Sequence, residues 1–325
     1  MEEVKTLPMR MPPCETYQGM AFIMGVLLSH ENIKNYFHNT YISLRCANSD
    51  KMWDLTLELN HILWDPLGED GVFEVNRYNA DALSEDSFVG FLKERIRQGN
   101  YILLFQIDEF YLSYSQDYNN RHFIHDVYIY GYDNDCFCVM AYRDDRLQLF
   151  KVKQTEIRDA FYSCCKECEG EVAFCTCRPW HLANIEIDYK KMKESIIDYY
   201  MGAISDNHLY GILTYQAIIR ALKKMKEDEC PETIDVRVFR MLWEHKILMR
   251  SHLETLGNKM SVNDAIEAAS EVEKIGEKVF RLSMKYRMTK ADKTLEKMIE
   301  NIEYMEKKER QYLSRLVELF KCCIN

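Results

Sequence analysis

Four β-rich runs follow one another closely in the middle of the chain, and they constrain the fold more than any other feature. Aromatic and aliphatic residues dominate all four, and a Gly-Tyr-Asp-Asn-Asp turn signal separates two of them. The runs are YILLFQIDEFYL, HDVYIYGYD, CFCVMAY and RLQLFKV. Strands with such short connections pair with their sequence neighbours, so the pattern predicts an antiparallel sheet.

Helical patterns precede these strands. Apolar residues recur at helical spacing from Tyr17 to Ser29, after the structure-breaking pair Pro12-Pro13. Residues 48–65 and 81–98 predict two further helices. Helices followed by consecutive strands are typical of the α+β class, with the first helix packed on one face of the sheet.

The β pattern ends at Pro179. Two long amphipathic helical segments, 188–227 and 231–325, follow it. A chain of 325 residues is longer than a single hydrophobic core usually serves. We therefore predict two domains, an α+β domain over residues 1–180 and an all-helical domain over residues 181–325.

Cys14 is the candidate nucleophile. It follows two prolines and is expected to open the first helix, where backbone N–H groups and the helix dipole favour a thiolate. The alternative is a small buried apolar residue, in a chain that has twelve cysteines.

His125 is the candidate proton-transfer partner of this cysteine. It directly precedes a hydrophobic strand, so its imidazole is expected at a strand mouth that a helix N-terminus can face. His122 is the competing histidine, with a surface or substrate-contacting role as its alternative. We prefer His125 because of its position relative to the strand.

A third group should orient the imidazole and fix its tautomer. Asp108 is the first candidate, because a carboxylate inside an apolar strand is costly unless it is hydrogen-bonded or used in chemistry. A strand-end residue paired with arginine or backbone is its structural alternative. The other candidates, most of them in expected turns, are Asp126, Asp133, Asp144 and Asp145.

Composition narrows the class of partner. The formal net charge of −10 argues against nucleic acid, whose binding proteins concentrate lysine and arginine. The absence of a long apolar stretch and of a signal pattern predicts a cytoplasmic protein without membrane contact. A cysteine cluster lacks the paired spacing of a zinc site, so we expect free thiols and no metal at Cys164, Cys165, Cys168, Cys175 and Cys177.

Three segments together resemble the N-terminal domain of butirosin biosynthesis protein H and its relatives. These segments are PPCETYQGM, LLFQIDEFYLSY and HFIHDVYIYGYD. They share with that family a Cys opening a helix, an acidic residue followed by an aromatic and Tyr-Leu, and a His leading into a strand that ends Gly-Tyr-Asp. The resemblance covers residues 8–160, and the helical C-terminal part is similar to the extension these proteins carry. It implies a papain-like fold followed by a helical domain.

The resemblance also implies an acyltransferase that forms an amide bond in natural-product, for example antibiotic, biosynthesis. Members of the family move an acyl group from the phosphopantetheine thioester of a carrier protein to an amine. By motif position, Cys14 would accept the acyl group, His125 would move protons and Asp108 would be the third member. The implied partners are an acyl or peptidyl carrier protein and a small-molecule amine, with no further cofactor.

One feature departs from the family pattern. Papain-like enzymes usually end the next strand with Asp or Asn, whereas this chain has Val139-Met140-Ala141-Tyr142. Two other functions therefore stay open. A cysteine peptidase or amidase would use water in place of the amine, and a non-catalytic interaction protein would bind a partner through its helical domain.

Overall fold

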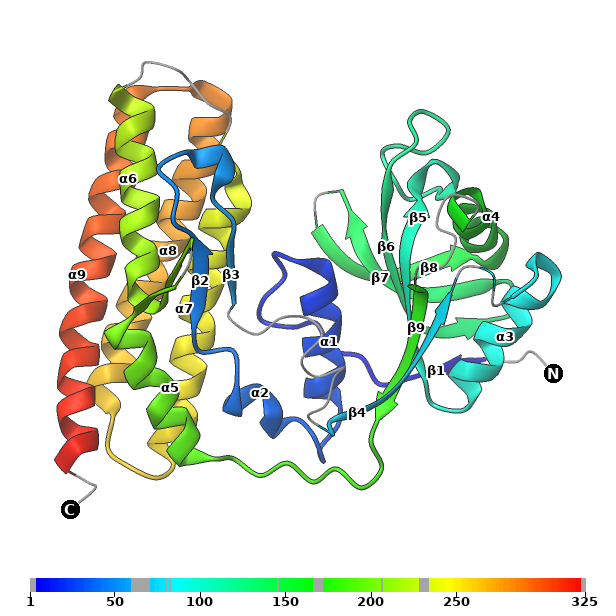
Figure 1. Ribbon diagram of the computed structural model, residues 1–325, viewed down its shortest axis with the longest axis horizontal. Helices are drawn as coiled ribbons and strands as arrows, with labels where there is room; N and C mark the ends of the chain where they lie inside the picture. Colours follow the sequence, from blue (N-terminus) through cyan, green and yellow to red (C-terminus); the bar gives the residue numbers. More distant parts are fainter. Residues whose placement is uncertain are drawn as a thin grey trace. The chain divides into compact units, whose positions relative to one another are not determined.

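The structure, a computed structural model, describes residues 4–59, 71–79, 81, 83–144, 146–165, 172–205, 207–227 and 234–322 (Figure 1). The chain divides into two compact units. Unit 1 comprises residues 1–34 and 63–185, and unit 2 comprises residues 35–62 and 186–325. Both contain helices and an antiparallel sheet, so the chain has a mixed α and β fold.

Unit 1 is built on a seven-stranded sheet with the order β4-β9-β5-β6-β7-β8, and β1 pairs with β6. The four predicted β-rich runs are confirmed as β5 to β8, whereas β4 and β9 were not predicted. The strands are β1 (Lys5–Thr6), β4 (Phe73–Asn79), β5 (Tyr101–Asp108), β6 (Ile124–Asp133), β7 (Cys136–Arg143), β8 (Arg146–Lys153) and β9 (Val172–Pro179).

Helices cover both faces of this sheet (Figure 1). As predicted, the first helix packs on one face, where Phe22 of α1 stacks on Tyr128 of β6 with ring centroids 5.1 Å apart. On the other face, Phe88 of α3 stacks on Phe161 of α4 at 4.5 Å, and both rings meet Phe174 of β9. The helices are α1 (Gln18–Ser29), α3 (Glu85–Arg97) and α4 (Gln154–Cys165).

The predicted helix at residues 48–65 is wrong where the structure describes that segment. A 3₁₀ turn η1 (Met52–Asp54) and strand β3 (Leu57–Leu59) occupy this part of the chain, directly after strand β2 (Leu44–Ala47). Residues 60–65 lie outside the described ranges. The Leu-Glu-Leu of β3 alternates buried, half-buried and buried side chains, which is the period of a strand.

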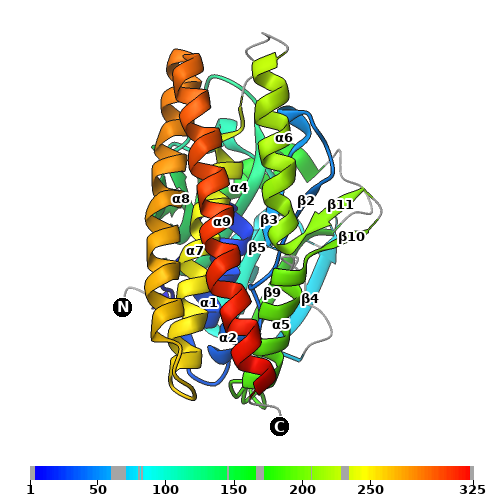
Figure 2. The same cartoon turned by 90° about the vertical axis from the view of Figure 1, so that its left-hand side faces the viewer.

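Unit 2 combines a helical bundle with a small sheet, so the prediction of an all-helical domain is wrong in this respect. The sheet has the order β10-β11-β2-β3, and its later strands are β10 (Ala203–Ser205) and β11 (His208–Tyr210). Figure 2 shows the bundle helices α6 to α9 lying side by side along their lengths. The helices are α2 (Asn35–Asn39), α5 (Tyr189–Met201), α6 (Thr214–Glu227), α7 (Val236–Gly257), α8 (Asn263–Thr289) and α9 (Asp292–Cys322).

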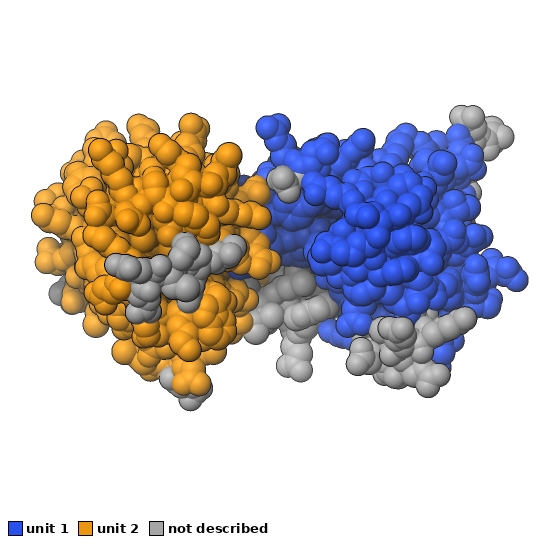
Figure 3. Space-filling view, turned by 90° about the horizontal axis from the view of Figure 1, so that it is seen from above, with its two compact units in different colours: residues 1–34, 63–185 blue, residues 35–62, 186–325 orange. Residues whose placement is uncertain are grey.

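Residues 35–62 belong to unit 2, although they precede most of unit 1 in the sequence (Figure 3). Two histidines of α7 hold the beginning of this segment. His245 Nε2 lies 2.6 Å from the Ile42 carbonyl oxygen, and His252 Nε2 lies 2.8 Å from that of Thr40. The single boundary expected between residues 180 and 181 is therefore replaced by a chain that enters unit 2 twice.

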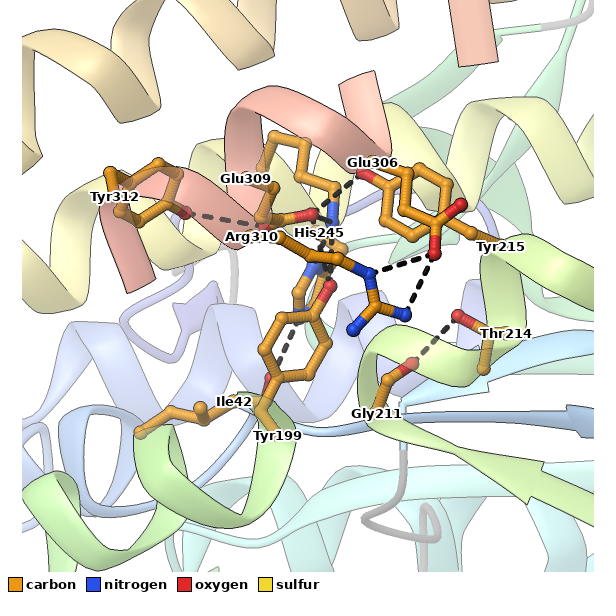
Figure 4. A network of polar contacts seen from close by, with 11 residues as sticks. Ile42, Tyr199, Gly211, Thr214, Tyr215, His245, Glu306, Glu309, Arg310 and Tyr312 are labelled. Atoms are coloured by element: carbon orange, nitrogen blue, oxygen red, sulfur yellow. Dashed lines mark hydrogen bonds and ion pairs between the residues drawn. The ribbon is translucent and has the colours of Figure 1, made fainter. Parts of the chain in front are cut away.

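A polar network is buried inside unit 2 (Figure 4). The ammonium of Lys246 on α7 lies 2.7 Å from Glu309 Oε2 on α9, 2.9 Å from the Tyr199 hydroxyl and 3.1 Å from His245 Nδ1. The Glu309 carboxylate also accepts hydrogen bonds from the hydroxyls of Tyr199, Tyr215 and Tyr312. The charge of the lysine is thus balanced within the bundle by a carboxylate with several donors.

No helix among the described residues combines the length and the apolar character that crossing a membrane requires.

We predict that Gly211→Ala destabilises unit 2 by about 2 kcal/mol. Gly211 has φ +61°, and an added Cβ would lie 2.4 Å from the Tyr199 carbonyl oxygen, so both the backbone and its neighbour would be strained. Urea unfolding of the variant measures the effect. Gly90→Ala on α3 is the control, because nothing lies within 4 Å of its added Cβ and alanine favours a helix. An equal response of the two variants would contradict the prediction.

Candidate functional site

Cys14 lies before α1 and not at its start. The helix begins at Gln18 after the N-cap residue Tyr17, and its first backbone bond runs from the Ala21 N–H to the Tyr17 carbonyl. The Glu15 carbonyl accepts a hydrogen bond from the Tyr142 hydroxyl of β7. Cys14 therefore precedes the helix and does not open it, which corrects the expected position. The Cys14 residue is fully buried.

Gln18 fastens the segment that contains Cys14 to unit 1. Its Nε2 donates to the carbonyl oxygens of Asp126 on β6 and Met140 on β7, at 3.2 and 3.1 Å. The Tyr142 hydroxyl bond to Glu15 holds the same segment against the end of β7. The segment around Cys14 therefore meets the sheet at the start of β6, which is where His125 lies.

The side chain of His125 is directed away from α1. His125 and Val127 share one face of β6, because side chains alternate along a strand, and Tyr128 lies on the opposite face, where it stacks on Phe22 of α1. The position of His125 in β6 therefore does not direct its side chain toward the N-terminus of α1, where we expected it.

Glu109 is the carboxylate that contacts His125. His125 Nδ1 lies 3.2 Å from Glu109 Oε1, and Ser115 donates to the other oxygen at 2.6 Å. The hydrogen bond to Glu109 raises the pKa of the His125 imidazole, although burial acts in the opposite direction. A histidine held in this way has a fixed tautomer, with Nε2 left to exchange a proton.

Asp108 contacts His122 and not His125, which corrects the expected pairing. His122 Nδ1 lies 2.6 Å from Asp108 Oδ2, and the backbone N–H of Phe110 donates to Oδ1 at 3.1 Å. The hydroxyl of Ser163 on α4 lies 3.4 Å from Oδ2. The carboxylate is buried and hydrogen-bonded, as a carboxylate in an apolar strand must be.

A β-bulge interrupts the pairing of β5 with β6 just before Asp108. The β5–β6 register passes from Leu104–Val127 to Ile107–His125, so β5 uses three residues where β6 uses two. In a regular strand Asp108 would share the face of Leu104, and hence that of His125. The bulge changes this register, so that Ile107 pairs with His125 and Asp108 pairs with Ile124.

The alternative aspartates have other partners. Asp126 accepts a hydrogen bond from the Gln106 backbone N–H and another from the Tyr128 hydroxyl. Asp133 pairs with Lys151, and Asp144 takes a positive φ of 52° beside a turn. Asp145 lies outside the described residues.

Sequence reasoning missed Glu109 and Gln18 as site residues. Glu109 directly follows Asp108, and His122 and His125 are three residues apart, so two acids and two histidines offered more than one pairing. Gln18 had a weaker signal, a polar residue on an otherwise apolar helix. Its amide joins three separate parts of unit 1, which the sequence alone does not indicate.

Buried thiols in unit 1 are held in their protonated form. Burial raises the pKa of Cys175 on β9 to about 11 and also raises that of Cys177. Among the described residues, no group of three or more His, Cys, Asp and Glu side chains is arranged to hold a metal ion. Cys168 of the cysteine cluster lies outside the described ranges.

No protein-family model matches the sequence, and no curated protein matches it significantly. The resemblance seen in the motifs around Cys14, Asp108 and His125 therefore rests on those residues alone.

Proposed function

We propose that this chain is a cysteine-dependent acyltransferase with a papain-like catalytic unit, which forms an amide bond. In this proposal the donor is the phosphopantetheine thioester of a carrier protein, and the acceptor is a small-molecule amine. One observation carries the proposal. Gln18 and Tyr142 fasten the Cys14 segment to the end of the sheet that also bears His122 and His125, each with a carboxylate on Nδ1.

The proposed reaction has two steps on Cys14. The Cys14 thiolate attacks the thioester carbonyl, and the pantetheine thiol leaves with the proton that the cysteine gave up. The amine then attacks the acyl-enzyme, loses a proton to an imidazole and forms the amide as the Cys14 thiolate departs. A thioester is a more reactive acyl donor than an amide, so the transfer requires no ATP.

His125 is the proposed proton carrier for Cys14. Its contact with Glu109 orients the ring and favours the imidazolium that forms during the reaction. In the described structure the ring lies on the face opposite α1, and Cys14 is covered. The proposed exchange therefore requires the donor to uncover the thiol and the imidazole to turn toward it.

Intact-mass measurement after exposure to acyl-pantetheine thioesters tests the proposal. We expect an acyl adduct on the wild type and its absence from Cys14→Ala. Cys138→Ala is the matched control, since it removes another buried thiol of unit 1 and should keep the adduct. Added amines should discharge the adduct faster than buffer alone. Equal discharge by water would support the peptidase or amidase instead, and an adduct that persists in Cys14→Ala would overturn the assignment.

A non-catalytic interaction protein is the second candidate. One observation favours it, namely the complete burial of Cys14. In that case no donor in the panel forms an adduct, and iodoacetamide at neutral pH modifies Cys14 only after the protein is unfolded.

A further inference from the structure

The pair Asp108–His122 has the geometry of an oriented general base. Asp108 is 3% exposed, and its carboxylate can only accept hydrogen bonds, so the Nδ1 of His122 at 2.6 Å is the donor. The neutral ring then carries its free lone pair on Nε2. The carboxylate is itself fixed by the backbone N–H of Phe110.

Packing fixes the plane of the His122 ring while leaving one edge open. The ring stacks on Phe110 with centroids 4.4 Å apart and planes 17° apart. The His122 side chain nevertheless remains 67% exposed. A ring held at Nδ1 and on its flat face, with Nε2 accessible, is arranged to take a proton from a bound molecule.

A third histidine–carboxylate pair in unit 1, besides those of His122 and His125, shows what distinguishes the pair Asp108–His122. His181 Nδ1 lies 2.9 Å from Glu74, but Glu74 also pairs with the Arg178 guanidinium at 2.5 Å and is 29% exposed. The arginine neutralises that carboxylate, and water screens it. Asp108 is buried, and it contacts the Phe110 N–H, the Ser163 hydroxyl and His122. The first two donors are uncharged, so among these contacts the histidine is the group that the negative charge of Asp108 can polarise.

Apolar side chains are exposed in the loop and strand end that carry His122. Tyr118, Phe123 and Ile124 are 43%, 41% and 48% exposed. These three side chains are near His122 in the sequence and open to solvent, so they are available to contact an apolar part of a ligand.

We propose that His122 is the catalytic base for the acceptor amine and that Asp108 is its positioning residue. This inference rests on the proposed function. The acceptor is an amine with an apolar or aromatic body that contacts Tyr118, Phe123 and Ile124. When the neutral amine attacks the Cys14 acyl-enzyme, Nε2 of His122 takes the proton that the new amide nitrogen must lose, and the imidazolium returns it to water. His125 serves the thiol step and His122 the amine step.

Separate measurement of the two half-reactions tests this assignment. Acyl-enzyme formation on Cys14 should be the same in the wild type and in His122→Ala, whereas discharge by benzylamine should fall about 100-fold in the variant. Added imidazole should restore part of the rate. Asp108→Asn should lower the discharge rate and Asp108→Glu should recover some of it, which a purely structural role would not produce. His181→Ala is the control and should behave as the wild type.

The outcomes separate this inference from the proposed function. If the wild type forms no acyl-enzyme, the proposed function fails and the inference fails with it. If the acyl-enzyme forms but His122→Ala discharges at the wild-type rate, only the inference is overturned. A preference for benzylamine over ethanolamine that is reduced in Phe123→Ser supports the apolar contact, and equal use of the two amines overturns that part.

Discussion

Replacing Lys246 with methionine is expected to lower the free energy of unfolding of unit 2 by about 3–5 kcal/mol. The replacement leaves the Glu309 carboxylate buried without its cation, and burying an unpaired charge is among the costliest changes in a protein interior. Glu309→Gln should cost a similar amount, because it leaves the buried ammonium without a carboxylate.

The geometry of the network explains why the stability of unit 2 depends on both Lys246 and Glu309. The Lys246 ammonium has three protons, and its three close acceptors are Glu309 Oε2, the Tyr199 hydroxyl and His245 Nδ1. All of its donors are thus used, and the side chain is only 1% exposed. The pair is shielded from bulk solvent, so removal of one partner leaves the other with the full desolvation penalty.

Hydrogen exchange measured by mass spectrometry follows this effect within unit 2. Peptides of α7 and α9 should exchange through openings that cost several kcal/mol less in Lys246→Met than in the wild type. Lys223→Met is the matched control, because Lys223 and Glu303 also join two bundle helices at 2.7 Å but are 53% and 46% exposed. Its loss should be below about 1 kcal/mol. Equal protection in the two variants would show that the buried pair does not stabilise the bundle.

The parts of the fold that could be predicted are those with local signals. The strands between Tyr101 and Lys153 are rich in aromatic and β-branched residues, and turns separate them. Strand β4 was missed because its sequence, FEVNRYN, is largely polar, as an edge strand of a sheet can be. Strand β9 was missed because its cysteines were considered only as members of a cluster of free thiols, although Cys175 and Cys177 are buried in the sheet.

The candidate site was predicted less well than the strands that carry it. Residue types and order placed Asp108 and His125 on neighbouring strands, and they are there. The register between their strands shifts at the bulge between Leu104 and Ile107, where Gln106 takes a φ of 54°. A positive φ at a glutamine has no sequence signature, so the register of the strands beyond it could not be predicted.

We expect unit 2 to lose stability on mild acidification because of His245. The Ile42 carbonyl can only accept, so His245 carries its proton on Nε2 and presents a bare Nδ1 to the Lys246 ammonium. Burial lowers the pKa of His245 well below its ordinary value, and the Lys246 charge adds to this effect. The other charged group of the network, Glu309, is already paired with the lysine.

The direction of this pH effect follows from the number of protons that the folded and unfolded states bind. Below about pH 6.5 the unfolded His245 binds a proton that the folded residue does not, so unfolding becomes more favourable as pH falls. Each pH unit below this costs at most about 1.4 kcal/mol until the lowered folded pKa is reached. Burial also lowers the pKa of His252, but hydrogen bonds to backbone carbonyls partly offset it, so we assign the larger share to His245.

Urea unfolding followed by circular dichroism between pH 7 and 4.5 measures this dependence, with His245→Gln as the informative variant. A glutamine amide can donate to the Ile42 carbonyl and accept from Lys246, so it retains both hydrogen bonds without titrating. The variant should lose less stability on acidification than the wild type, by the amount assigned to His245. His181→Gln replaces an exposed histidine and should keep the wild-type slope. Carboxylates titrate in all three proteins and contribute equally to the change of the free energy of unfolding with pH. If this change is the same in His245→Gln and the wild type, acid acts through the carboxylates. The buried imidazole is then not the acid-sensitive group of the bundle.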